Sequence, residues 1–274
     1  MLSVIIPASN EEAWIGRCLA ALLASDPVPG GAEAVVVANG CQDATVEVAR
    51  GFAAQAAAAG WGFAVLDRAQ GGKPAALNAG DRAAQGDARA YLDADVVVGP
   101  GLAAQLALAL ARPEAAYATG RAVIPRPASR VSRAYARFWQ RLPFAQGAAP
   151  GHGLYAVNAA GRARWGAFPP VISDDTFVRL HFRPMERHHC AAPYDWPMIE
   201  GFGPLVRVRR RQDAGVAELA RLYPALASRA ERTRPTLPHL ARLALQDPAG
   251  FATYAAVSLA VRLPAAKTGW TRGR

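Results

Sequence analysis

The chain is poor in lysine, in cysteine and in long apolar segments, and each shortage excludes a class of protein. Only two of its 31 basic residues are lysines, so arginine carries nearly all of the positive charge. The three cysteines, Cys18, Cys41 and Cys190, form no CxxC pair, which excludes a disulfide framework and favours a reducing, cytoplasmic compartment. The uncharged run Pro248–Val261 is short of the roughly 20 residues that span a bilayer as a helix. No basic leader and apolar segment precede the first predicted strand, so we expect no signal peptide.

The residues that are present suit one large domain, or one domain with an appendage. The chain has 274 residues, of which 52% are hydrophobic and 19% charged, so it can bury a sizeable core. Its net charge of +10 is unevenly placed: residues 201–274 hold 13 basic against 4 acidic residues, a difference of +9. A basic tail on a nearly neutral body indicates an anionic partner for the tail, either nucleic acid or an acidic membrane face.

Strand-like and helix-like segments alternate through the first hundred residues. Such alternation predicts a parallel sheet with right-handed crossovers, which binds ligands at the carboxyl ends of its strands. Beyond residue 115 the pattern is less regular, and beyond residue 215 it is helical and amphipathic, broken by prolines. Strands are expected at 3–7, 34–38, 63–66, 90–92 and 154–157, and helices at 11–25, 43–59, 74–85, 131–142 and 174–181.

Polar residues follow the first two predicted strands. The first strand leads into Pro7, Ala8, Asn10 and Glu11, and the second ends at Asn39. These residues either line a nucleotide pocket or simply form turns and helix caps. The GxGxxG loop of a dinucleotide-binding fold is missing here, which argues against a dehydrogenase.

Charged residues mark two further strand ends. Lys73 follows a Gly-Gly pair at a predicted helix start, a corner that suits phosphate, although a surface lysine would look the same. Asp93 and Asp95 follow a buried strand, where two carboxylates are costly unless a cation meets them. Hard oxygen ligands favour Mg²⁺ or Mn²⁺ shared with a diphosphate, and a solvated loop pair is the alternative.

A later acidic pair, Asp174 and Asp175, precedes a predicted helix. It either caps that helix or supplies a general base that deprotonates a hydroxyl. Asp175 is the candidate base, and Asp174 is expected on the acceptor side. His152, in a glycine-rich loop before a strand, is placed to meet an acceptor better than to bind a metal.

Taken in order, the segments SVIIPASNEE, VVVANGCQDAT, GGKPAALNAG, YLDADV and ISDDTF resemble the family 2 glycosyltransferases of the GT-A fold, over about residues 2–215. The resemblance implies a Rossmann-like α/β fold, with a mainly parallel central sheet flanked by helices and a C-terminal helical extension. We therefore expect a glycosyltransferase domain at 1–215 and a basic extension at 216–274. The implied roles are nucleotide contact for Pro7, Asn10, Glu11 and Asn39, ribose or metal contact for Asp93, metal ligation for Asp95, and catalytic base for Asp175.

The predicted reaction is inverting, metal-dependent transfer of a hexose from a nucleotide-diphosphate sugar to a saccharide or lipid-linked acceptor, in bacterial polysaccharide or glycolipid assembly. Arg211, in the arginine run at 207–211, is expected to offset charge on the leaving diphosphate. The family often has Asp where Asn39 stands, and Glu-Asp where Asp174-Asp175 stands. The Gln-x-x-Arg-Trp signature of processive synthases is missing, which argues against processive polymerisation.

The basic extension is expected to lie on the inner face of the cell membrane, because arginines alternate with apolar positions along it. The alternative is a helical subdomain that packs on the core. Nucleic acid is not expected as a partner, since the aromatic residues of the tail are too scattered for base stacking. A sugar nucleotidyltransferase would need a glycine-rich loop after the first strand, and a donor-binding module without catalysis remains a further alternative.

Overall fold

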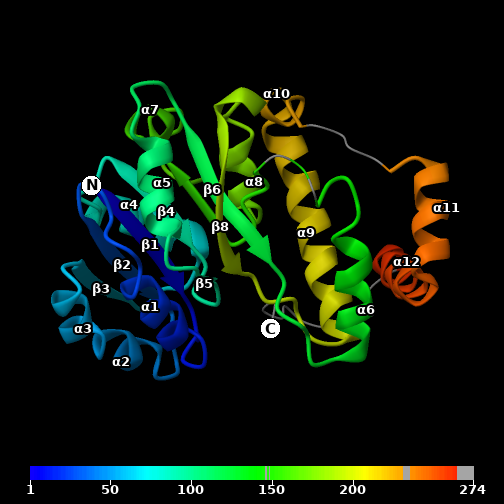
Figure 1. The fold of residues 1–274 in the computed structure, drawn as a ribbon, viewed down its shortest axis with the longest axis horizontal. Helices are drawn as coiled ribbons and strands as arrows, with labels where there is room; N and C mark the ends of the chain where they lie inside the picture. Colours follow the sequence, from blue (N-terminus) through cyan, green and yellow to red (C-terminus); the bar gives the residue numbers. More distant parts are fainter. Residues whose placement is uncertain (146, 148, 231–234, 264–274) are drawn as a thin grey trace. The chain divides into compact units, whose positions relative to one another are not determined.

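A computed structural model of the chain describes residues 1–145, 147, 149–230 and 235–263, and it forms two compact units (Figure 1). The sheet unit comprises Met1–Val123 and Gly151–Trp196. The helical unit comprises Ile124–Pro150 and Pro197–Arg274, in so far as these residues are described. Each unit is built from two separate stretches of the chain, because Ile124–Pro150 leaves the sheet unit and the chain then returns to it.

The sheet has eight strands in the order β3-β2-β1-β4-β7-β6-β8-β5. The first half, β3 to β4, is parallel, as the alternation of strands and helices predicts. In the second half β7 runs antiparallel to both β4 and β6, β6 pairs with β8 in parallel, and β5 is antiparallel to β8. The predicted α/β class with a helix-flanked central sheet is confirmed. The strands are β1 Leu2–Ala8, β2 Ala32–Asn39, β3 Gly62–Arg68, β4 Ala88–Leu92, β5 Val97–Val98, β6 Tyr117–Val123, β7 Leu154–Val157 and β8 Arg187–Asp195.

Two predicted helices of the sheet unit have different bounds in the structure, and the helices at Leu102–Leu110 and Ala159–Arg162 were not predicted. The first begins at Ile15, because residues 11–14 form a turn. The single helix expected at 43–59 is two short helices separated at Gly51 and Phe52. The helices are α1 Ile15–Leu23, α2 Thr45–Arg50, α3 Ala53–Ala58, α4 Lys73–Ala83, α5 Leu102–Leu110, α7 Ala159–Arg162 and α8 Asp174–Arg179, with a 3₁₀ turn at Pro184–Glu186.

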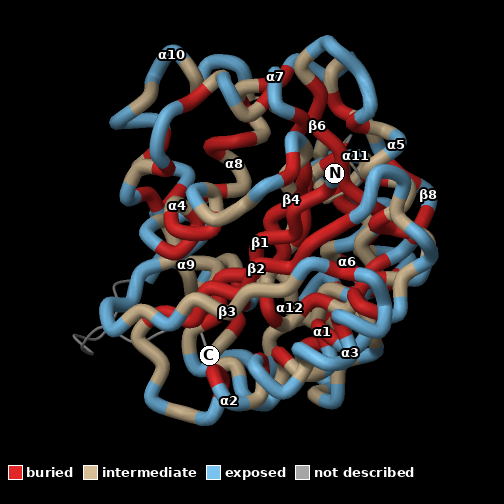
Figure 2. Tube along the Cα trace, turned by 90° about the vertical axis from the view of Figure 1, so that its left-hand side faces the viewer, coloured by how far each residue is buried: buried red, intermediate tan, exposed pale blue. Residues whose placement is uncertain are grey.

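Both faces of the parallel half are covered, which is why β1 and β2 are buried along their whole lengths (Figure 2). Val4 and Ile6 face a core that α1 and α5 complete. Ile5 points to the other face, since successive strand residues alternate, and there it meets α4. A Cβ on Gly80 of α4 would lie 2.3 Å from Ile5 Cγ2, so only glycine lets the helix pack this closely. This close packing fixes the start of α4, and with it Lys73, above the sheet.

The helical unit is built around α6 Arg130–Trp139, which is packed against α12 Pro248–Arg262. Its core holds Tyr135 of α6, Leu205 of α9 and Val257 of α12. Arg137 of α6 pairs with Asp247 through two hydrogen bonds of 2.6 and 2.7 Å, which tie α6 to the start of α12. The remaining helices are α9 Phe202–Leu222, α10 Pro224–Ala227 and α11 Leu237–Gln246.

The expected extension at 216–274 begins inside α9, and its last residues, 264–274, lie outside the described residues. Several of its apolar positions, including Leu219, Leu243 and Val257, are buried within the helical unit. Others are exposed, notably Leu237, Leu245 and Leu259. Among the described residues, no helix combines the length and apolar character that crossing a membrane requires.

Candidate active site

A small cavity lies at the carboxyl ends of β1 and β4, where the alternating pattern predicts a ligand site. Its volume is about 30 Å³, enough for a water molecule or two. Five residues predicted for the site, Pro7, Lys73, Asp93, Asp174 and Asp175, line it together although they are far apart in sequence. The remaining lining residues are Leu77, Tyr91, Leu92, Gly153 and Tyr155.

Lys73 links two of the predicted carboxylates. Its Nζ lies 2.8 Å from Asp93 Oδ1 and 3.1 Å from Asp174 Oδ1. Burial by itself lowers the pKa of Lys73, but the two carboxylates outweigh it, and the pKa is raised. The lysine is therefore a fixed positive charge, and it neutralises carboxylates that would otherwise be costly at this depth.

The acidic pair that begins α8 is held in two different ways. Asp174 is buried, and its second oxygen accepts a hydrogen bond of 3.0 Å from the Tyr155 hydroxyl. Asp175 is half-buried, lines the cavity and accepts a bond of 2.6 Å from the Thr176 amide. Burial raises the pKa of both carboxyls, and Lys73 opposes the rise. Asp174 thus has structural partners on both oxygens, while Asp175 faces the cavity with a basicity above that of an exposed aspartate.

The Asp93–Asp95 segment forms a tight turn after β4. The Asp93 carbonyl accepts a hydrogen bond from Val96, and the Asp93 amide donates one of 2.8 Å to the Gly153 carbonyl. Gly153 has φ +69°, and a Cβ there would lie 2.8 Å from Val96 Cγ2, so glycine is required beside this turn. Asp95 is half-buried in the same turn. Two carboxylates two residues apart are thereby presented at one strand end.

By their chemistry the two carboxylates would suit a magnesium-like ion shared with a substrate diphosphate, although only Asp93 lines the cavity. No group of three or more His, Cys, Asp or Glu side chains gathers as a metal site among the described residues. Mg²⁺, however, is commonly held by one or two carboxylates together with waters and substrate phosphates. Asp93 Oδ1 lies 2.8 Å from the Lys73 ammonium, so an ion at this carboxylate would share it with that lysine.

The loops after β1 and β2 are joined by side-chain hydrogen bonds. Asn39 is buried; its Nδ2 donates to the Ala8 carbonyl at 2.8 Å and its Oδ1 accepts from Gly72 at 2.9 Å. Asn10 has a positive φ of 57° and accepts a bond of 2.8 Å from the Gln42 amide. Asn10 and Asn39, predicted as nucleotide contacts, therefore join the neighbouring loops to one another, and neither lines the cavity.

Seven predicted site residues do not line the cavity: Ala8, Asn10, Asn39 and Asp95, described above, and Glu11, His152 and Arg211. The Glu11 amide donates to Thr45 Oγ1 at 2.7 Å, in the same pair of loops. The His152 ring stacks on Trp196 at 4.9 Å, and burial lowers its pKa to about 4, so it is neutral near pH 7. Arg211 is exposed on α9 in the helical unit. The roles of Glu11, His152 and Arg211 remain predictions.

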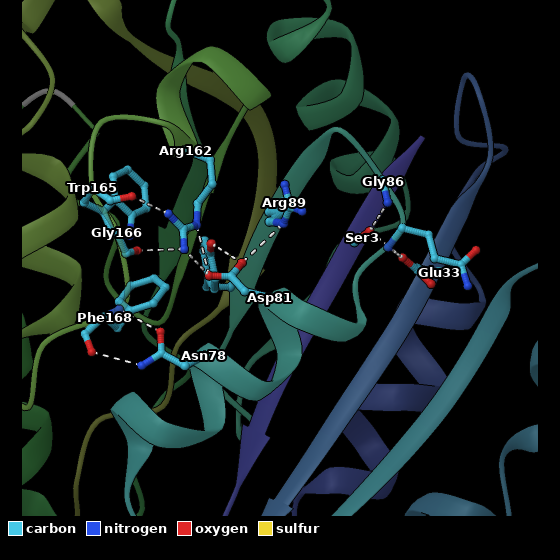
Figure 3. Close-up of polar contacts among 12 residues, drawn as sticks. Ser3, Glu33, Asn78, Asp81, Gly86, Arg89, Arg162, Trp165, Gly166 and Phe168 are labelled. Carbon is cyan, nitrogen blue, oxygen red and sulfur yellow. Dashed lines mark hydrogen bonds and ion pairs between the residues drawn. The ribbon is translucent and has the colours of Figure 1, made fainter.

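Two polar side chains of α4, Asn78 and Asp81, hold neighbouring segments by hydrogen bonds that the sequence did not reveal (Figure 3). Asn78 makes two hydrogen bonds with the backbone of Phe168, donating at 3.0 Å and accepting at 2.7 Å. Asp81 accepts from Arg162 at 2.8 Å and from the Tyr91 hydroxyl at 2.8 Å. Asn78 therefore positions the stretch of chain that leads from Phe168 to α8.

Comparisons with known proteins report the family and the fold. The family model described as Glycosyl transferase family 2 matches residues 3–165. The fold is similar to that of the mannosyltransferase PcManGT from Pyrobaculum calidifontis, solved with GDP-Man and Mn²⁺, at 24% identity and a TM-score of 0.57, covering 94% of this chain and 74% of that chain. TarS 1-349 from S. aureus gives 14% identity and a TM-score of 0.55, covering 95% and 91% of the two chains.

A third similar structure is glucosyl-3-phosphoglycerate synthase from Mycobacterium tuberculosis, solved with Mn²⁺, UDP and phosphoglyceric acid. It is 19% identical with a TM-score of 0.54, and the match covers 85% of this chain and 80% of that chain. At such identities the likeness to these solved structures shows the fold. No curated protein matches the chain. The family match spans more than half of the chain and all of the strand ends that carry the donor-side residues, so the chain belongs to glycosyl transferase family 2.

Proposed function

We propose that the protein transfers a sugar from a nucleotide-diphosphate donor to an acceptor hydroxyl with inversion at the anomeric carbon. The observation that carries this proposal is the position of Asp175, which shares one cavity with Asp93 and Pro7. A proposed base and a proposed donor-side carboxylate thus face the same small space. Membership of the family, and the nucleotide or nucleotide sugar present in the similar structures, support the donor class.

In the proposed reaction Asp175 accepts the proton of the acceptor hydroxyl while the oxygen of that hydroxyl attacks the anomeric carbon. The bond from that carbon to the donor diphosphate breaks on the opposite face, so one displacement inverts the configuration. A base must be deprotonated before it acts; burial raises the pKa of Asp175, and the charge of Lys73 opposes the rise. Asp174 and Tyr155 position the start of α8.

Asp95 and Asp93 are the residues proposed to hold Mg²⁺ or Mn²⁺. Such an ion offsets negative charge on a leaving diphosphate. Pro7, Ala8, Asn10, Glu11 and Asn39 would shape the nucleotide side of the pocket.

The first test separates the base from a helix cap. Asp175→Asn should bind nucleotide almost as the native protein does and turn over about 10²–10⁴-fold more slowly, the usual worth of a positioned base. The matched control is Asp67→Asn, which removes an exposed carboxylate from β3. An equal loss of nucleotide affinity and turnover would show a structural cap instead.

The donor and the stereochemistry are tested directly. Thermal shifts with UDP, GDP, CDP and dTDP, each with and without Mn²⁺, identify the preferred nucleobase of the donor and show whether nucleotide binding depends on metal. With the donor known, the anomeric proton coupling of the product reports its configuration. A product that retains the configuration of the donor would refute the single displacement, and a nucleotide that binds without any turnover would favour a binding module.

We also propose that the helical unit holds the enzyme at an anionic membrane surface, where lipid-linked acceptors are found. Its support is the arginine excess of residues 201–274 together with the exposed Leu237, Leu245 and Leu259. The full chain should sediment with vesicles that contain anionic lipid, and less as salt rises. Leu237→Ser/Leu245→Ser should weaken sedimentation, while indifference of the native chain at low salt would refute the proposal.

A further inference from the structure

The helical unit carries an open groove of about 370 Å³ that no role considered so far uses. That volume lies within the range of small-molecule sites, roughly 300–1,000 Å³. Four of its eight lining residues are arginines, and none of the lining residues that the structure describes is acidic. The groove is lined by Arg126, Arg133, Arg137 and Arg141, with Ile124, Pro127, Ala136 and Gln140.

The spacing of three of these arginines sets the shape of the positive surface. Arg133 and Arg137 are four residues apart on α6 and therefore share one face of the helix, and Arg141 follows at the same interval in the turn after it. Like charges at this spacing repel one another unless an anion lies between them. Arg126 adds a fourth charge from the segment that precedes α6.

Two of the arginines are already oriented by the protein. Arg137 makes its paired bonds to Asp247, so its charge is largely neutralised. Arg133 donates to the carbonyls of Pro127 and Ala128, at 2.9 and 2.8 Å, which holds its guanidinium in place without neutralising it. Among the described residues, neither Arg126 nor Arg141 has a side-chain hydrogen bond or a carboxylate within 4.0 Å. Within the described part of the chain, three positive charges are thus left without an ion pair, although the charge of Arg141 also acts on Asp247, whose pKa it helps to lower.

We infer that this groove binds a phosphoryl group, as a phosphate monoester or a diphosphate. Guanidinium groups match the oxygens of phosphate in charge and geometry, and a phosphate monoester carries about two negative charges near pH 7. One carboxylate would neutralise only one of the three charges, whereas a monoester or diphosphate neutralises most of them. A phosphorylated or lipid-linked acceptor carries such a group, an extension that rests on the proposed glycosyl transfer.

The test uses the full chain and inorganic pyrophosphate, titrated calorimetrically in buffer with EDTA so that metal-assisted binding is suppressed. The test variant Arg126→Gln/Arg141→Gln removes the two arginines without structural partners, and it should lower pyrophosphate affinity by about tenfold for each arginine removed. The matched control Arg221→Gln/Arg229→Gln removes two exposed arginines of the helical unit that do not line the groove. Arg137→Gln is a second comparison: it removes an arginine that is paired with Asp247, so it should lower the stability of the fold as well as the positive charge of the groove.

Two arms distinguish the sources of the phosphoryl group. Phosphatidylcholine vesicles with and without phosphatidic acid test a lipid headgroup, and pyrophosphate tests a free ligand. Binding to both, lost in the groove variant alone, supports a lipid phosphate; binding to pyrophosphate alone supports a free phosphate ester. Absence of saturable binding in both arms, or equal loss in the groove and control variants, overturns the inference. Nucleotide binding with Mn²⁺ is measured on every variant, so failure here is separable from failure of the proposed function.

Discussion

Replacement of Lys73 by methionine tests whether one ammonium stabilises the whole carboxylate cluster. The substitution keeps the length of the side chain and removes the charge that lies 2.8 Å from Asp93 and 3.1 Å from Asp174. Asp174 would keep the Tyr155 hydroxyl but would remain a buried carboxylate without a cation. Breaking a fully buried ion pair costs about 3–5 kcal/mol. Since the Lys73 side chain is 33% exposed, water screens part of this, and we expect a loss of about 2–3 kcal/mol.

The loss should depend on pH in a direction that identifies its cause. In Lys73→Met, the pKa values of Asp174 and Asp175 should rise further, because burial then acts without the opposing cation. A carboxyl whose folded pKa is raised penalises folding above that pKa, and the penalty is relieved as the pH falls through it. The variant should therefore recover part of its deficit as the pH falls below neutral.

The assay is urea unfolding followed by the fluorescence of the six tryptophans, combined in a double-mutant cycle with Asp174→Asn. In the Asp174→Asn background, Lys73→Met should cost clearly less, because no buried charge is left unpaired at residue 174. Arg82→Met, which removes an exposed charge from the same helix, is the matched control and should stay within about 0.5 kcal/mol of the native protein. A loss for Lys73→Met that is no larger than that of Arg82→Met, or an unchanged loss in the Asp174→Asn background, would refute the reasoning.

Three further outcomes are expected. Asp95→Asn should abolish Mn²⁺-dependent nucleotide binding, measured calorimetrically, while the variant still folds; wild-type transfer by this variant would show that Asp95 holds no essential metal. Gly80→Ala should destabilise the fold by about 1–2 kcal/mol in urea, since overpacking against Ile5 costs about 1–3 kcal/mol and the helix gains at most about 1 kcal/mol; a neutral result would mean that α4 shifts freely. Arg164 holds the pKa of Glu186 at about 2. Glu186→Gln should therefore be less stable than the native protein above about pH 4.5, and the difference in stability should vanish as the pH falls toward 2. A difference in melting temperature that stays constant across that range would contradict the ion pair.

The parallel half of the sheet was predictable because its strands carry their own signal. β1 and β2 are β-branched runs buried on both faces, and each is followed by a recognisable helix. The antiparallel half carries no such signal. β8 contains two histidines, a proline and charges at both ends, and β6 has Gly120 at its centre. Their strand character comes from pairing with distant partners, which local periodicity does not report.

The positions of the candidate site residues at strand ends were predictable, but the ion pairs and hydrogen bonds that connect them were not. The rule that ligands bind at carboxyl ends of strands places Pro7, Asn39 and Asp93 correctly near one edge. It does not show that Lys73 joins Asp93 to Asp174, a residue that lies 101 positions after Lys73 in the sequence. Nor does it show that both polar groups of Asn39 are used by backbone. Turn residues and pocket residues are of the same chemical types, and only their three-dimensional partners separate them.

The topology explains why one lysine connects the two sides of the proposed reaction. Asp93 comes from the parallel half, at the end of β4, while the acidic pair at the start of α8 follows β7, the antiparallel strand beside it. Lys73 begins α4, which lies over β1 and β2 and so reaches both. Its charge lowers the pKa of Asp175 while the charge of Asp93 raises it. A cation or diphosphate that changed the charge at Asp93 would therefore change the pKa of Asp175, so occupancy of the proposed donor side and the basicity of the proposed base would be physically linked.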